Sequence, residues 1–100
     1  MRKRMKNLSD LKKTLVLGRE VEMLTYNGTT PPEKLRGTRE VVAVQTNGVY
    51  LAPFPESKRR SFFDFPKATD LEIHTTKHFT ISDRTKEGEV WCVREYLIKN

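Results

Sequence analysis

A run of three cations, Lys58-Arg59-Arg60, stands next to an aromatic residue, Phe62, in the middle of this chain. Aromatic rings stack on nucleobases while lysine and arginine attract phosphates, so this combination is typical of proteins that bind single-stranded nucleic acid. Tyr50, on a half-apolar sheet face described below, would stack in the same way, and Arg36 and Arg39 would extend the path of positive charge. The alternative is that Phe62 packs under a loop and that the cations form a solvated turn.

Residues that carry out catalysis or bind metals are few and scattered. His74 and His78 are the two histidines, and Cys92 is the one cysteine, whereas structural zinc sites usually gather four ligands in close pairs. A turn is expected between the two histidines, which would place them on different sides, and the apolar neighbours of Cys92 indicate a buried small residue. Because carboxylate pairs and a glycine-rich phosphate loop are also missing, we expect no enzyme activity, no metal and no cofactor.

The elements that must position these residues are mostly strands. Asn47-Gly48 separates two β-branched runs, residues 38–46 and 49–52, and Asn-Gly is the preferred pair for a type I′ hairpin turn. This register predicts a core face made of Val42, Val44, Thr46, Val49 and Leu51. It predicts an outer face made of Val41, Ala43, Gln45, Tyr50 and Ala52. Since the outer face is half apolar, either the N-terminal helix covers it or it is a contact surface.

Alternation and turn signals predict further strands over residues 19–26, 61–65, 71–74 and 78–82. Within one of these strands, Phe63 and Phe65 are expected to point inward and Phe62 outward. Residues 90–98 fit both a strand and a helix, and their aromatic and β-branched side chains favour a strand. A short helix is expected to begin at Ser9 or Asp10 and to end at Gly18.

One hundred residues suffice for a single domain with a modest core. Seven short strands predict a mainly β protein (α+β by a strict count): a small, mostly antiparallel barrel, PUA-like or SH3-like, with one short N-terminal helix. The single cysteine suits a reducing compartment. Because no secretory signal or membrane-spanning run is visible, we expect a cytoplasmic protein without a membrane partner, either a monomer or a homodimer.

The net charge of +6 is concentrated near the N-terminus. Residues 1–13 hold six bases and one acid, whereas the rest of the chain holds 13 bases and 12 acids. We expect residues 1–7 to form a flexible basic arm and residues 8–100 to form a single β-barrel domain. Such an arm either attracts phosphate or is a solvated chain end.

Residues 18–28, 44–51 and 63–68 together resemble small plasmid and phage proteins of low-GC Gram-positive bacteria, in particular the PrgU-like group of pheromone-responsive conjugative plasmids. The resemblance implies a PUA-like barrel, which is a fold associated with RNA binding. It also implies a cytoplasmic accessory protein of a mobile element that regulates the expression of conjugation genes. It carries over no catalytic residues.

Two functional hypotheses follow from these observations. The first is a small RNA-binding or single-stranded nucleic-acid-binding protein that acts as a post-transcriptional regulator, with the cations and rings named above as its contacts. The second is a protein–protein interaction module, such as an inhibitor of a host protein, that acts through the half-apolar sheet face. A homodimer formed through that same face is a third possibility.

Overall fold

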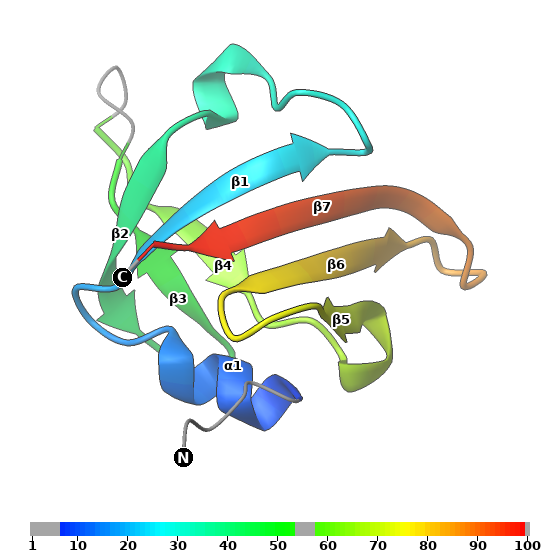
Figure 1. The fold of residues 1–100 in the computed structure, drawn as a ribbon, viewed down its shortest axis with the longest axis horizontal. Coiled ribbons are helices and arrows are strands. Elements are labelled where there is room, and N and C mark those ends of the chain that lie inside the picture. The colour runs from blue at the N-terminus through cyan, green and yellow to red at the C-terminus, as the bar shows by residue number, and fades with distance from the viewer. Residues whose placement is uncertain (1–6, 54–57, 100) are drawn as a thin grey trace.

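The computed structural model describes residues 7–53 and 58–99, which form one antiparallel sheet with a short helix against it (Figure 1). The helix α1 spans Leu8–Thr14. The strands are β1 Glu20–Tyr26, β2 Thr38–Val44, β3 Gly48–Leu51, β4 Ser61–Asp64, β5 Leu71–Ile73, β6 His78–Arg84 and β7 Val90–Ile98. Two short 3₁₀ turns, η1 Glu33–Leu35 and η2 Ala68–Asp70, lie in the connections. The mainly β fold class expected from the sequence is therefore confirmed.

The strand order in the sheet is β4-β3-β2-β1-β7-β6-β5. Strands β1 to β4 form one meander and β5 to β7 form a second, and the pairing of β1 with β7 joins them. The segment that fitted both a strand and a helix is a strand, because Cys92, Tyr96 and Ile98 point into the core at alternate positions. The outermost strands β4 and β5 do not pair with each other, so the sheet is barrel-like but not closed.

The sheet curls strongly around its own core. Phe63 in β4 contacts Phe79 in β6 and Tyr96 in β7, with ring centroids 6.4 and 5.3 Å apart. In a flat sheet, β4 and β6 would lie five strand spacings apart, or about 24 Å. Register shifts occur in three ladders, at Leu24 in β1, at Val42 in β2 and next to Trp91 in β7. Because bulges bend strands and increase their twist, they account for the curl.

Helix α1 lies against the concave side of the curled sheet, where Leu11 and Leu15 are fully buried in the core. The side chain of Asn7 accepts a hydrogen bond from the Asp10 amide (3.1 Å), so Asn7 is the N-cap, and the prediction of Ser9 or Asp10 was wrong. The helix ends at Thr14, well before Gly18. In the part of the chain that the structure describes, no helix is long and apolar enough to cross a membrane. Residues 1–6 of the expected basic arm lie outside the described residues.

The β2–β3 hairpin turns one residue earlier than predicted. The Gln45 amide donates to the Gly48 carbonyl (2.8 Å), so Thr46 and Asn47 form the turn, and neither has a positive φ. The left-handed pair that a type I′ turn requires lies instead at Asn27-Gly28, with φ values of 51° and 81°. This pair joins Tyr26 and Thr29, which exchange two backbone hydrogen bonds of 2.8 and 3.1 Å.

The shifted turn and the bulge at Val42 also correct the predicted faces of this hairpin. Val41 pairs with Leu51 and is fully buried, whereas Val42 and Val44 are 36% and 48% exposed. The predicted core face was therefore right for Val49 and Leu51 but wrong for Val42, Val44 and Thr46. The extra residue at the bulge moves the side chains of β2 that precede it to the opposite face, and this is why Val41 left the predicted outer face. Because α1 packs on the concave side, it does not cover that outer face.

Candidate functional site

Two aromatic rings and a guanidinium group meet on the outer face of β3 and β4. Tyr50 and Phe62 are directly opposed in the ladder, and their rings contact edge to face with centroids 4.9 Å apart. The Arg60 guanidinium carbon lies 4.4 Å from the centre of the Tyr50 ring, which is a cation–π contact. We call these three residues the outer aromatic cluster. The structure thus places together three of the seven predicted site residues.

Gly48 explains how Phe62 reaches its position. A Cβ atom added to Gly48 would lie 2.6 Å from the Phe62 ring and 2.3 Å from the Phe63 carbonyl oxygen. Only glycine lets the ring and the β4 backbone approach this closely. The Phe62 side chain remains 36% exposed, so the ring covers the glycine with one part and meets solvent with another. The sequence left open whether Phe62 is packed or exposed. In the structure its ring is both packed against Gly48 and partly exposed.

Several of the predicted cations lie at the end of the sheet where β4 begins. Lys58 and Arg59 are exposed and lie immediately before Arg60, at the start of β4. Arg36 is exposed too and precedes β2, and its Nε donates to the Pro31 carbonyl (2.8 Å). Because β2 and β4 both flank β3 in antiparallel fashion, their first residues lie at the same end of the sheet. Arg36 therefore shares this end with Lys58, Arg59 and Arg60.

Arg39 does not join this surface. It pairs with Val21, whose side chain is buried in the core, so Arg39 points to the concave side of the sheet. Its Nε and Nη2 atoms both donate to the Ala52 carbonyl, at 3.0 and 2.8 Å. Burial lowers the pKa of Arg39, which is the effect of removing water from a cation. The guanidinium of Arg39 thus fixes the end of the β2–β3 hairpin from the side opposite to the outer aromatic cluster.

The half-apolar contact surface proposed for a protein partner does not contain Val41, its largest aliphatic residue. Val41 is fully buried, and Ala43, Tyr50 and Ala52 are half-buried. Exposed apolar side chains occur elsewhere, and among the described residues the most exposed are Leu17 and Trp91, at 66% and 57%. The sequence pattern did not single out these two residues, because Leu17 lies in the turn between α1 and β1, and Trp91 lies at the register shift in β7.

The two histidines lie together, contrary to the expectation from the turn between them. Residues 75–77 reverse the chain from β5 to β6, which brings the ring centroids of His74 and His78 to 4.6 Å. His78 pairs with the Glu95 carboxylate, and Nε2 of His74 lies 2.6 Å from the Thr80 hydroxyl. The hydrogen bond from His78 is the largest influence on Glu95 and lowers the pKa of its carboxyl group. Within residues 7–53 and 58–99, no three His, Cys, Asp or Glu side chains are placed to hold a metal ion.

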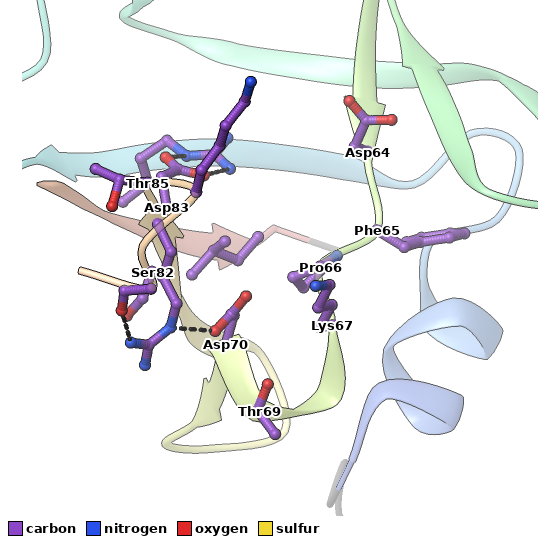
Figure 2. Close-up of a pocket in the computed structure, with 14 residues that line it drawn as sticks. Asp64, Phe65, Pro66, Lys67, Thr69, Asp70, Ser82, Asp83 and Thr85 are labelled. Atoms are coloured by element: carbon purple, nitrogen blue, oxygen red, sulfur yellow. Dashed lines mark hydrogen bonds and ion pairs between the residues drawn. The ribbon is translucent and has the colours of Figure 1, made fainter. Parts of the chain in front are cut away.

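A pocket of about 420 Å³ lies where the sheet fails to close. As Figure 2 shows, Asp64, Pro66 and Lys67 stand on one side of it, and Ser82, Asp83 and Thr85 stand on the other. The first group leaves β4, and the second belongs to the end of β6 and the turn that follows. Sequence reasoning missed this pocket because its walls come from segments that are adjacent only in the curled sheet.

No protein-family model, curated protein or solved structure matches this chain. The resemblance to the PrgU-like group therefore stays a prediction.

Proposed function

We propose that this protein binds single-stranded RNA or DNA through the outer face of β3 and β4. The observation that carries the proposal is the outer aromatic cluster, in which the half-buried Tyr50 ring contacts the more exposed Phe62 ring and Arg60 lies against Tyr50. Bases stack on aromatic rings with about 1–3 kcal/mol each, and this stacking tolerates any base. The proposed contact is thus general for single strands rather than specific for a sequence.

The cations around the outer aromatic cluster supply the second half of the proposal. Lys58, Arg59, Arg60 and Arg36 lie at one end of the sheet, where a phosphate backbone would pass the rings. Basic residues in the segment 1–6 would add to this attraction. In the cell, binding of this kind suits a cytoplasmic post-transcriptional regulator, and the resemblance to PrgU-like proteins would make conjugation genes of a mobile element the target.

The test is fluorescence anisotropy with labelled single-stranded RNA, single-stranded DNA and duplex DNA of equal length, over a series of salt concentrations. We expect both single strands to bind more tightly than the duplex, because only unpaired bases can stack. The double variant Arg59→Ala/Arg60→Ala removes two phosphate contacts, so the slope of log K against log salt falls by about 1.4 for single strands. Phe62→Ala weakens binding about tenfold at every salt concentration.

Lys13→Ala is the matched control, since it also removes an exposed cation, but from α1. It leaves the affinity and the salt slope nearly unchanged. Deleting residues 1–6 while keeping the helix cap Asn7 measures the contribution of the basic segment separately. The proposal is wrong if no single strand binds at low salt, or if Lys13→Ala flattens the slope at least half as much as Arg59→Ala/Arg60→Ala, since each lost charge would then count the same.

A further inference from the structure

The pocket at the opening of the sheet has walls that are fixed by two ion pairs (Figure 2). Arg84 in β6 donates through Nε to Asp70 of η2 (2.6 Å) and through Nη1 to the Gly88 carbonyl (2.8 Å). Arg94 in β7 donates to both Asp83 oxygens, at 2.7 and 2.9 Å, and also to the Tyr96 hydroxyl (2.8 Å). The first pair ties the β4–β5 connection to the β6–β7 hairpin, and so joins the two walls of the pocket.

Three charged side chains of the pocket take no part in these pairs. Lys67, on the segment that leaves β4, and Lys86, in the β6–β7 turn, come from opposite walls. Asp64 lines the pocket on the same side as Lys67. Among the described residues, none of these three side chains has an ion-pair or hydrogen-bond partner. The pocket therefore presents two spare cations and one spare carboxylate on a scaffold whose other charges are neutralised.

This arrangement selects a ligand by charge and by size. Two lysines that line the same pocket are suited to a phosphate group, because each ammonium is a compact donor. The hydroxyls of Thr69 and Ser82 also line the pocket and can donate to phosphate oxygens. A volume of about 420 Å³ leaves room for an organic body beyond the phosphate, within the range of small-ligand sites. Pro66, which is half-buried and lines the pocket, gives that body apolar surface.

We propose that the pocket binds a small phosphate monoester of about the size of a nucleoside monophosphate. The phosphate lies between Lys67 and Lys86, and Asp64 accepts a hydrogen bond from a hydroxyl or amino group of the organic part. This site is separate from the outer aromatic cluster in its residues, although Asp64 and Phe62 belong to the same strand. It does not depend on the proposed binding of polynucleotides.

The test is a titration of the ¹⁵N-labelled protein, followed by amide chemical shifts, with AMP, UMP and ribose 5-phosphate, and with adenosine and inorganic phosphate as comparisons. We expect the monophosphates to shift amides of residues 64–70 and 82–88 at millimolar concentration, and to leave residues 58–62 unaffected. Lys67→Ala and Lys86→Ala each weaken binding about tenfold, the effect of losing one charge-assisted contact. Lys13→Ala, on α1, is the control and leaves the affinity unchanged.

Three results would overturn the assignment. The first is the absence of shifts around the pocket with every phosphate ester. The second is adenosine that binds as tightly as AMP, since the phosphate would then contribute nothing. The third is inorganic phosphate that binds as tightly as the esters, since the organic part would then have no place in the pocket. None of these results tests the binding of single strands, because that assay changes neither Lys67 nor Lys86.

Discussion

Phe62 and Phe63 are neighbours in β4, yet they belong to opposite regions of the molecule. Phe63 is 5% exposed and packs edge-on against Phe79 and Tyr96 inside the curl. Phe62 is 36% exposed and meets Tyr50 on the outside. Both regions are aromatic clusters with similar ring geometry, so ring chemistry does not distinguish them. A cation lies against each cluster, but Arg94 beside Tyr96 is half-buried and paired with Asp83, whereas Arg60 beside Tyr50 is exposed. The inner rings therefore stabilise the fold, while the outer rings keep part of their surface exposed, which the proposed binding of single strands requires.

The sharpest test of this comparison is to truncate each phenylalanine in turn. Phe63→Ala leaves a cavity between β4, β6 and β7, and we expect it to lower the free energy of unfolding by about 3–5 kcal/mol. Phe62→Ala removes one edge contact and a ring that is partly in water, and we expect a loss of about 1 kcal/mol. Urea unfolding followed by circular dichroism measures both. Equal losses for the two variants would show that the outer ring is a core residue.

Gly48 lies against both Phe62 and the backbone of Phe63. We expect Gly48→Ala to lower the free energy of unfolding by about 1–3 kcal/mol. The added Cβ would meet the Phe63 carbonyl oxygen, which is backbone and cannot move aside easily. Gly88→Ala is the matched control: its Cβ would enter open space, and its cost comes from φ of +88° alone, about 1 kcal/mol. Thermal unfolding of both variants separates close approach from backbone conformation. A smaller loss at Gly48 than at Gly88 would contradict the packing described here.

The two Asn-Gly pairs show how far the sequence could predict this fold. Strand positions, the antiparallel arrangement and the opposite faces of Phe62 and Phe63 follow from alternation, and they are confirmed. The same Asn-Gly dipeptide, however, is a left-handed turn at Asn27 and the start of a strand at Gly48. Local turn preference favours both positions equally. What decides between them is the approach of Phe62 over Gly48, which is a tertiary contact and has no local signal.

The candidate sites divide in the same way. Arg60, Phe62 and Tyr50 could be grouped from the sequence because one hairpin and one strand place them together. Arg39 could not be placed, because the bulge at Val42 inverts the face of everything before it. The pocket, likewise, depends on the curl of the sheet. Bulges and the curl of the sheet arise from packing of the whole core, so the residue pattern of a single strand does not predict them.

Charged groups can be compared between the two faces of the sheet in the same way. We expect Asp83→Asn to lower the free energy of unfolding by about 1–3 kcal/mol. Asp83 pairs with Arg94, which lies on the concave side between Ile81 and Tyr96. Burial by itself lowers the pKa of Arg94, but Tyr96 and Asp83 raise it, and the net pKa lies above the ordinary value. The ion pair with Asp83 therefore stabilises the charged form of the half-buried Arg94 guanidinium. Arg60→Ala, on the outside, is expected to cost less than about 0.5 kcal/mol, and urea unfolding of the two variants compares them. If Arg60→Ala costs more, the outer cluster is structural.

The smallest expected effect is a pH dependence on the outer face of β6 and β7. The pKa of Glu95 is lowered chiefly by its hydrogen bond to His78, and the Thr25 hydroxyl also favours the carboxylate. A carboxyl group whose pKa is lower in the folded state stabilises the fold above its unfolded-state pKa, about 4.3. This contribution is lost as the pH falls through the folded-state value.

We therefore expect Glu95→Gln to reduce the loss of stability on acidification below about pH 4.3, measured as the urea midpoint from about pH 6 to pH 3. Glu72→Gln, an exposed carboxylate near His74, is the control and keeps the full acid dependence. An unchanged acid limb in Glu95→Gln would contradict the pairing of His78 with Glu95.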